Sequence, residues 1–583
     1  MGPTYRPKKP ISDLMAKDVS FEIKDKDIAG RICRLRIGSR ELETPALMPV
    51  YSPIKPVISP QELWSVFGCR ALMTNSYIIL KNPKLKEDIL KRGIHDFLGF
   101  QGIVATDSGS YQLMEYGNVT ATNKEIIDFQ GDIGSDIGSF LDIPSLPDAY
   151  KMRAEEQLEI TLERAKEATD ARFLVNAGIQ GSTHLDLRKK AATELGRDYK
   201  LCAVGGIVKL MEAYRFSDLV DIISTVKQNI PANRIVHAFG LGHPMVFSLA
   251  VAMGCDLFDS AAYALYAEGM RYLTPTGTMR LEELTYLPCS CPVCSKHGTG
   301  LKELPHEEKV RELARHNLYA SMQEINTIKE AIKENTLWEL VNMRCRAHPQ
   351  LYKALKTLLE QEYLAEYDPI TKKSAFYYQG AESEKRTEVV NVKKRLANVE
   401  SNNKADIPPY GPVPWELSDI YPFNSLKDEI EYAGCKISDL CKVRAIMDYQ
   451  FGIGAGELIP DKALIKKSKA TRRIRGIYEG KELIAAVRAS DHFIIPHEKL
   501  ADRLHAKFPY PKLRIKIDDE AVEYVKDGKS VFAKFVTDID PDLRAGDEAL
   551  VVDKDDKLLR TATLVMSPKE ALDFDRGMAA TVR

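Results

Sequence analysis

The sequence has almost no excess of charge of either sign. Its 82 lysines and arginines balance 83 aspartates and glutamates, which gives a formal net charge of −1 at pH 7. Any contact with nucleic acid must therefore come from a local basic surface. No apolar run reaches the roughly 18 residues that a bilayer crossing needs. The first 15 residues also lack the apolar stretch of a secretory signal. We therefore expect an intracellular, cytoplasmic protein without membrane contact.

Cysteine is scarce and unevenly distributed. The chain contains 10 cysteines, most of them isolated. Three form a C-x-C-x-x-C pattern: Cys289, Cys291 and Cys294. In a reducing compartment, clustered thiols favour a metal over disulfides. Three thiolates need a fourth ligand to complete a tetrahedral site, and His297, His306 and His316 are the candidates. Such a closed site would be structural, whereas the alternative is three free cysteines close together by chance.

Short apolar runs alternate with helix-like segments between residues 45 and 258. Eight runs predict strands: Pro45–Val50, Ala71–Thr74, Gly102–Ala105, Ile137–Leu141, Phe173–Ala177, Leu201–Val204, Arg234–Phe239 and Gly254–Phe258. One intervening segment, Ala149–Glu167, predicts a helix with one apolar face: Met152, Leu158, Leu162 and Ala165. Eight strands alternating with helices are the pattern of a (β/α)8 barrel. An open doubly wound sheet is the alternative, but the glycine-rich phosphate turn expected early in that fold is missing.

The segments around the predicted barrel differ in character. Residues 20–43 alternate between apolar and polar and predict a β-hairpin, while residues 305–365 are helical. Residues 366–412 are polar and predict a linker or irregular segment. A mixed α/β region follows, and short strands from about Pro511 predict a small β-barrel of an RNA-binding kind. The expected fold class is therefore α/β, a barrel with a metal-binding insertion followed by α+β accessory domains and a small β-barrel.

Acids or amides follow four of the predicted strands. They are Asp107 in TDSGS, Asp142 in LDIPS, Gln180 in GIQG and Asp259 in DLFDS. The carboxyl ends of barrel strands meet at one rim, where barrel enzymes place their active sites. The alternative for Asp107 and Asp259 is that each caps the helix that follows its strand. We expect Asp256, His237 and His243 to be structural.

The order and spacing of several motifs make the chain resemble the tRNA-guanine transglycosylases, and more closely their archaeal branch, which acts in archaeosine biosynthesis. The motifs are TPALMPVYS, MTNSYII, TDSGSYQLM, LDIPS, NAGIQGS, AVGGIV, HAFGLGHP, DLFDSAAYA and the cysteine cluster followed by His316. The C-terminal segment is similar to PUA domains. Together these stretches cover nearly the whole chain.

The resemblance implies a role for each rim residue. Asp259 would be the nucleophile that attacks C1′ of the ribose, and Asp107 its acid/base partner. The residues that would hold the purine are Asp142, Tyr111, Gln180, Gly205, Gly206, Ile207, Val208, Phe239 and Gly240. Tyr111 and Phe239 would sandwich the base, although both can also be ordinary core aromatics. His316 would complete a site for one structural Zn2+ ion.

The resemblance also implies the partners and the domain organisation. The expected reaction replaces guanine at position 15 of the tRNA D-arm by 7-cyano-7-deazaguanine (preQ0), in a homodimer that acts alongside an archaeosine-synthase partner. The expected domains are a catalytic barrel with its zinc site at 289–316 (1–365), a linker with a first accessory domain (366–435), a second accessory domain (436–508) and a PUA domain (509–583). Two alternatives are a non-catalytic tRNA-binding paralogue and an anticodon-directed, queuine-type enzyme.

Basic residues collect in one short segment, IKKSKATRRIRG. The run consists of Lys466, Lys467, Lys469, Arg472, Arg473 and Arg475. A basic run of this kind is often only a solvated face. Because it precedes the predicted RNA-binding domain, we expect it to contact tRNA phosphates without recognising the base sequence.

Overall fold

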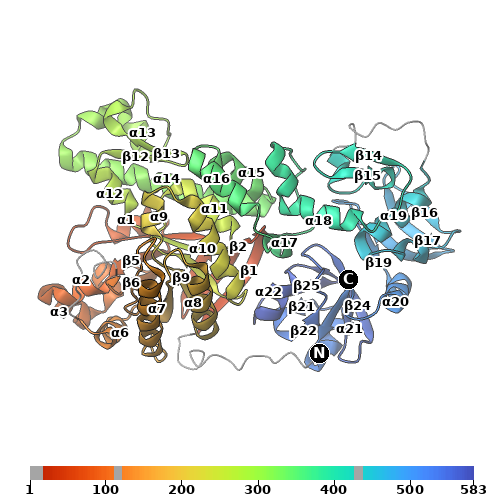
Figure 1. Cartoon of the computed structure of the whole chain (residues 1–583), viewed down its shortest axis with the longest axis horizontal. Coiled ribbons are helices and arrows are strands. Elements are labelled where there is room, and N and C mark those ends of the chain that lie inside the picture. Colours follow the sequence, from red (N-terminus) through yellow and green to blue (C-terminus); the bar gives the residue numbers. More distant parts are fainter. Residues whose placement is uncertain (1–17, 111–120, 426–436) are drawn as a thin grey trace. The chain divides into compact units, whose positions relative to one another are not determined.

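The computed structural model describes residues 18–110, 121–425 and 437–583. The chain divides into two compact units (Figure 1). One unit runs up to Lys333 and includes Leu340–Leu358, and the other consists of Glu334–Glu339 and Leu359–Arg583. Within the described ranges, no helix combines the length and apolar character that a bilayer crossing requires.

A small antiparallel sheet opens the first unit. Its strands are paired in chain order: β1 (Val19–Asp27), β2 (Gly30–Ile37) and β3 (Arg40–Thr44). The sequence predicted a two-stranded hairpin here, whereas the structure has three strands. The third strand forms because the chain turns again at Gly38, where φ is 59°. Leu35, Ile37 and Leu42 of this sheet are buried against the first residues of the barrel strands. The sheet thus covers the amino end of the barrel.

The central feature of the first unit is a closed parallel sheet. Its eight strands are β4 (Ala46–Pro49), β5 (Ala71–Asn75), β6 (Ile103–Asp107), β7 (Ile137–Gly138), β8 (Leu174–Ile179), β9 (Leu201–Val204), β10 (Ile235–Ala238) and β11 (Leu257–Ser260). They pair in the order β4-β11-β10-β9-β8-β7-β6-β5. A parallel bridge between Val50 and Met73 joins the two end strands. The predicted barrel is confirmed, and the open doubly wound sheet is excluded.

Helices lie outside the strands and connect them (Figure 1). They are α1 (Pro60–Ser65), α2 (Ser76–Lys81), α3 (Pro83–Arg92), α4 (Ile94–Leu98), α6 (Asn123–Asp132), α7 (Lys151–Lys166), α8 (Leu185–Asp198), α9 (Val208–Glu212), α10 (Phe216–Asn229), α11 (Phe247–Ala252) and α12 (Ala262–Glu268). The helix predicted over Ala149–Glu167 is α7. Its buried face contains Leu158, Leu162 and Ala165 as predicted. Met152 instead is 73% exposed, because it lies about 240° around the helix from Leu158.

The chain continues from the barrel into a hairpin and a set of helices. They are β12 (Arg271–Thr274), β13 (Gly277–Arg280), α13 (Pro292–His297), α14 (His306–Glu334), α15 (Leu337–Cys345) and α16 (Pro349–Leu358). Figure 1 shows β12, β13, α13 and α14 grouped at one end of the barrel. The helical character predicted for residues 305–365 is confirmed.

The described residues of the second unit form a mixture of helices and three sheets. Its first elements are α17 (Leu364–Tyr367), α18 (Thr387–Leu396), β14 (Lys404–Ile407), β15 (Gly411–Pro414) and α19 (Asp439–Phe451). A four-stranded antiparallel sheet and a helix follow: β16 (Leu464–Lys467), β17 (Ile474–Glu479), β18 (Glu482–Val487), β19 (Ile494–Pro496) and α20 (Glu498–Lys507).

The segment predicted to be a linker is more ordered than expected. Residues 366–412 contain α18 and most of the β14–β15 hairpin. A buried ion pair explains part of this order, because the Arg386 guanidinium contacts the carboxylates of Glu339 and Glu388. The Tyr421 hydroxyl also donates to Glu388 at 2.9 Å. Charged residues that pair inside the protein look like a polar linker in the sequence.

The C-terminal residues form the predicted small β-structure. Its six strands are β20 (Arg514–Ile517), β21 (Val531–Phe532), β22 (Val536–Ile539), β23 (Glu548–Val552), β24 (Leu558–Leu564) and β25 (Met578–Val582), with α21 (Val522–Lys526) and α22 (Pro568–Asp573) between them.

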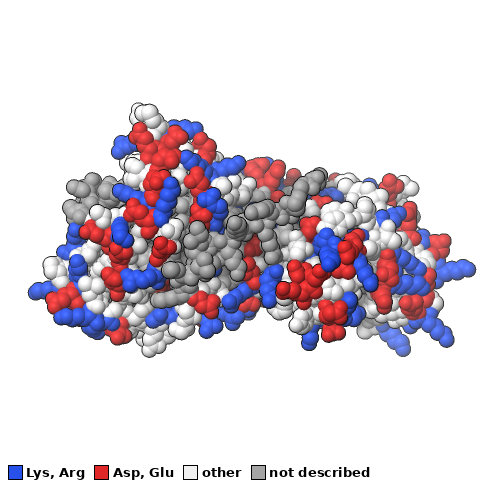
Figure 2. Space-filling model, turned by 90° about the horizontal axis from the view of Figure 1, so that it is seen from below, with Lys and Arg blue, Asp and Glu red and all other residues white. Residues whose placement is uncertain are grey.

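On the face of the chain drawn in Figure 2, basic and acidic side chains are interspersed, as the near-zero net charge predicts.

Candidate active site and metal centre

One cavity of about 1040 Å³ opens at the carboxyl ends of the barrel strands. Residues at or after all eight strands line it. The predicted site residues among them are Asp107, Asp142, Gln180, Gly205, Gly206, Val208, Phe239, Gly240 and Asp259. Ile207 is fully buried and lies at the start of α9. Tyr111 lies outside the described residues. The barrel therefore brings together residues that are up to 152 positions apart in the sequence.

Asp259 is the penultimate residue of β11, and its carboxylate contacts two neighbouring groups. The backbone N–H of Gly240 donates to its Oδ1 at 2.6 Å, and His237 Nε2 lies 2.9 Å from the same oxygen. The other ring nitrogen of His237, Nδ1, contacts the Asn176 amide, with Nδ2 at 3.1 Å and Oδ1 at 3.3 Å. Asp259 does not cap the next helix, because Ser260 Oγ accepts the Ala262 N–H instead.

Asp107 ends β6 and faces two other carboxylates. The Asn75 amide donates to its Oδ2 at 2.8 Å, and the Gly109 N–H donates to Oδ1 at 3.3 Å. The second bond is the local contact that a turn or cap aspartate makes. The alternative that Asp107 has a local capping role therefore describes part of its contacts. Burial, with the charges of Asp142 and Asp259, raises the pKa of Asp107 from 3.8 to about 7. A carboxyl with such a pKa carries its proton at neutral pH about half of the time.

Asp142 and Gln180 form a buried polar pair beside the cavity. Gln180 Nε2 donates to Asp142 Oδ2 at 2.5 Å. Burial raises the pKa of Asp142, and hydrogen bonds from Ser110 and Gln180 oppose this rise. The pair fits only because its neighbours are glycines. A Cβ on Gly178 would lie 2.4 Å from Asp142 Oδ2, and one on Gly205 would lie 2.2 Å from Gln180 Nε2.

A buried arginine fixes the strand ends that carry this pair. The Arg188 guanidinium donates to the carbonyls of Ile179 at 2.6 Å and Gly205 at 2.8 Å, at the ends of β8 and β9. Burial lowers the pKa of Arg188 to about 9, and the charge of Asp142 opposes this effect. The sequence predicted neither Arg188 nor Asn75. For Arg188, the only signal was its place beside the apolar helix positions of Leu187 and Ala191.

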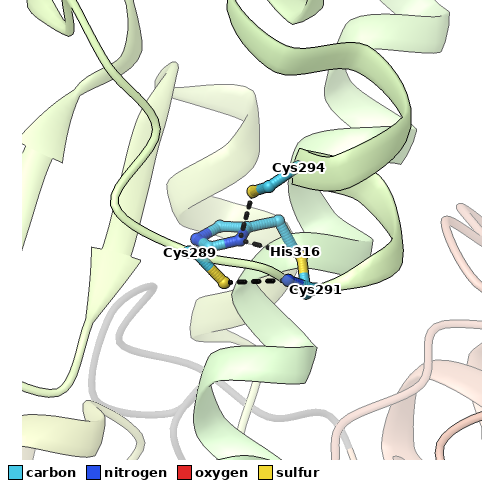
Figure 3. A group of neighbouring side chains, drawn as sticks. All are labelled: Cys289, Cys291, Cys294 and His316. Carbon is cyan, nitrogen blue, oxygen red and sulfur yellow. Dashed lines mark hydrogen bonds between the residues drawn. The ribbon is translucent and has the colours of Figure 1, made fainter.

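The cysteine cluster converges with one histidine (Figure 3). The ligand atoms of Cys289, Cys291, Cys294 and His316 all lie within 4.8 Å of one another. His316 Nε2 donates to the Leu273 carbonyl at 3.0 Å. Its Nδ1 therefore carries the lone pair and faces Cys294 Sγ at 3.3 Å. Three thiols and one imidazole are the donors of a structural tetrahedral site, so the residues fit a metal ion.

The other candidate histidines do not join this cluster. His297 Nε2 lies 3.7 Å from a carboxylate oxygen of Glu312. His306 is the exposed first residue of α14. The Tyr272 ring stacks on the His316 imidazole with a centroid distance of 3.6 Å. The hydroxyl of Tyr272 lies 3.2 Å from Cys294 Sγ.

The basic run lies in the second unit, on β16, β17 and the turn between them. Several of its side chains already have neighbours there. Lys467 pairs with Asp439 at 2.6 Å, and Lys466 Nζ lies 4.1 Å from the centroid of the Tyr478 ring. Arg473 Nη1 is 3.1 Å from His492 Nε2. The run is therefore partly engaged within its own sheet.

A closed parallel barrel with interacting carboxylates at its carboxyl rim is typical of barrel enzymes. The chain belongs to the queuine tRNA-ribosyltransferase family, whose model matches residues 25–350. A patch-forming domain C2 of tRNA-guanine transglycosylase matches residues 441–511, and a PUA domain matches residues 513–583. The predicted resemblance is thus confirmed.

Curated relatives match over nearly the whole chain. A tRNA-guanine(15) transglycosylase of Pyrococcus furiosus is 48% identical over 573 residues, which cover 97% of each chain. The protein of the same name from Thermococcus kodakarensis is 46% identical over 575 residues, covering 97% of this chain and 99% of the relative. That of Methanocaldococcus jannaschii is 39% identical over 653 aligned positions.

Proposed function

We propose that this chain is a tRNA-guanine(15) transglycosylase that replaces guanine by preQ0 in archaeosine biosynthesis. The observation that carries the proposal is the convergence of Asp107, Asp142 and Asp259 in one barrel cavity, in a chain that matches curated enzymes of this name along its length. The PUA domain and the C2 domain support a tRNA substrate.

We propose that Asp142 and Gln180 recognise the purine. Guanine presents N1–H and N2–H2 donors on one edge, which suit the carboxylate of Asp142, and the glycine turn after β9 lets backbone N–H groups approach O6. Phe239 is half-buried and lines the cavity, which suits stacking against the base. Tyr111 stays a predicted second stacking partner. Ile207 would contribute only backbone, since its side chain is buried.

We propose that Asp259 is the nucleophile. Both of its donors bind Oδ1, which directs Oδ2 to the reaction. Attack of Oδ2 on C1′ forms an ester-like C1′–O bond and breaks the C1′–N9 bond, whose electron pair leaves with guanine. Asp107 supplies a proton to the departing base and takes one from preQ0, which then attacks C1′ and releases Asp259. Two displacements retain the configuration without ATP. His237 acts as a positioning residue for Asp259.

We propose that the cysteine–histidine cluster holds one Zn2+ ion. With four protein ligands the ion would have no open position, so its contribution is to stabilise the fold around α13 and α14. The basic run of β16 and β17 is proposed to bind tRNA phosphates. The homodimer, the archaeosine-synthase partner, the cytoplasmic location and the domain boundaries at 365, 435 and 508 stay predictions.

The pH dependence of Asp107 gives a specific prediction. Below pH 7 the carboxyl is protonated and can act as an acid, so single-turnover cleavage of guanine should plateau there and fall up to tenfold per pH unit above pH 7. The contribution of Asp107 to folding stability changes with pH in the opposite direction to that of an ion-paired aspartate. The folded state binds the proton more tightly, so Asp107 lowers stability progressively as the pH rises from about 4 to about 7.

The variant that tests this prediction is Asp107→Asn. It should lose exchange activity while its thermal midpoint, relative to that of the wild type, is higher at pH 8 than at pH 5. Activity can be followed as release of labelled guanine from tRNA. If the rate of guanine release by the wild type does not change between pH 6 and pH 9, another group must transfer the proton.

The proposed function itself predicts incorporation of labelled guanine into tRNA without ATP. Mapping the label should place it at position 15, and preQ0 should chase it out of the RNA. A label in the anticodon loop would indicate the queuine-type alternative. A protein that binds tRNA but incorporates no label would be the non-catalytic paralogue.

A further inference from the structure

The cavity continues past the three carboxylates to a hairpin that base exchange does not use. Residues Arg271, Thr276–Met279 and Arg280, all in or beside β12 and β13, belong to its lining. Its volume of about 1040 Å³ is slightly above the roughly 300–1,000 Å³ of typical pockets for drug-sized ligands. A single purine is smaller than such ligands, so the cavity has room for more of the substrate than the exchanged base.

Two arginines stand directly opposite each other on this hairpin. Arg271 pairs with Arg280 across β12 and β13, so both side chains lie on the same face of the hairpin. Like charges in this arrangement repel and lower the stability of the hairpin. Arg280 has a weak neighbour in Glu283 at 3.9 Å, and both side chains are exposed by more than 70%, so this pair offsets little of the repulsion.

The hairpin that carries the two arginines is firmly anchored. Tyr272 and Leu273, next to Arg271, are fully buried. The Leu273 N–H donates to Asn317 Oδ1 at 2.9 Å, and Asn317 Nδ2 donates to the Arg271 carbonyl at 3.1 Å. His316, the neighbour of Asn317 on α14, bonds the Leu273 carbonyl. The backbone beneath Arg271 is therefore fixed beside the cysteine cluster, while its side chain reaches the cavity.

We propose that Arg271 and Arg280 together bind a backbone phosphate of the RNA strand next to the exchanged nucleotide. This proposal rests on the proposed function, because it needs RNA in the cavity. A phosphate between two guanidinium groups forms charge-assisted hydrogen bonds with both and removes their mutual repulsion. A nucleotide drawn out of its stack brings its sugar and phosphates to the cavity mouth. Relief of the repulsion between the two arginines therefore contributes to the free energy of RNA binding.

The test is the double substitution Arg271→Gln/Arg280→Gln, with tRNA dissociation constants measured at four salt concentrations. We expect tRNA affinity to fall about tenfold or more at low salt, and the slope of log K against log salt to shrink by about one. Binding of free preQ0 should stay within error of the wild type, and the thermal midpoint should not fall, because the substitution removes the repulsion between the two arginines. The variant Arg271→Lys/Arg280→Lys should keep the slope but bind tRNA more weakly, because lysine cannot form the two-pronged contact.

A charge-matched control is available at the amino end of the barrel. Lys166 ends α7, and Arg172 precedes β8; both side chains are more than 60% exposed. Lys166→Gln/Arg172→Gln removes the same charge and should leave the slope unchanged. Equal slopes in the wild type and the hairpin variant would overturn the proposal, as would an equal loss of slope in the control. A wild type that neither binds nor modifies tRNA would instead refute the proposed function.

Discussion

Replacing Asp259 by Asn is expected to abolish guanine exchange, with a loss of about 10⁴-fold or more. An amide cannot form the covalent bond to C1′, whereas Asn can still accept the hydrogen bonds from Gly240 and His237 through its oxygen. Removing a nucleophile from an otherwise intact site typically has an effect of this size. The measurement is single-turnover release of labelled guanine from tRNA, together with detection of the covalent protein–RNA adduct on a denaturing gel.

Asp256 provides the matched control, three residues earlier on the same chain segment. Arg31 binds both of its carboxylate oxygens at 2.8 Å, and both side chains are almost completely buried. Asp256→Asn removes the carboxylate charge that pairs with buried Arg31 and should destabilise the protein by about 3–5 kcal/mol. Its folded fraction should still exchange guanine. If Asp259→Asn forms the adduct, or if Asp256→Asn is folded and inactive, the assignment of the nucleophile is wrong.

The second large effect is expected from the metal cluster. Cys294→Ser removes one of the four proposed ligands and should abolish binding of the proposed zinc ion, measured by metal analysis of the purified protein. Metal binding and folding are linked, and a structural zinc site contributes about 10 kcal/mol or more in isolated zinc-binding peptides. Within this larger unit we expect a loss of at least about 3 kcal/mol in unfolding free energy. Chelator added to the wild type should lower the unfolding midpoint in the same way.

Cys441 supplies the control for this experiment, since it is exposed and lies outside the cluster. Cys441→Ser should retain zinc and unfold like the wild type. His297→Ala should also retain zinc, because His297 contacts Glu312 and not the cluster. Loss of zinc from His297→Ala, with zinc kept in His316→Ala, would contradict the ligand set.

The barrel could be predicted from the sequence because buried parallel strands are continuous apolar runs. β8 and β9 are buried at every position, so each stands out between amphipathic helices. The same argument overestimated β7, which pairs only at Ile137 and Gly138 although the apolar run reaches Leu141. The strand stops where the chain turns to bring Asp142 into the cavity. Apolar character marks burial, but it does not mark where pairing ends.

The supporting residues of the site could not be predicted in the same way. The contact of His237 with Asn176 spans 61 positions, and its contact with Asp259 spans 22. Apart from its place in HAFGLGHP, no local pattern around His237 indicates that it contacts Asp259. Asn75 caps α2 through its Oδ1 and holds Asp107 through its Nδ2, and only the first role has a local pattern. Residues that act through long-range contacts become recognisable only when the barrel is closed.

The pair between Arg31 and Asp256 also constrains the order in which the chain can fold. Its partners are 225 positions apart, and Arg31 also binds the carbonyls of Ala232 and Arg234. During synthesis the amino-terminal sheet is made first, but Asp256, whose carboxylate pairs with Arg31, emerges only after β10 and directly before β11. Contacts of such separation form late and slow the folding of a domain. Until then, β4 has no β11 to pair with. We therefore expect the nascent barrel to depend on chaperones until residues near 256 have left the ribosome.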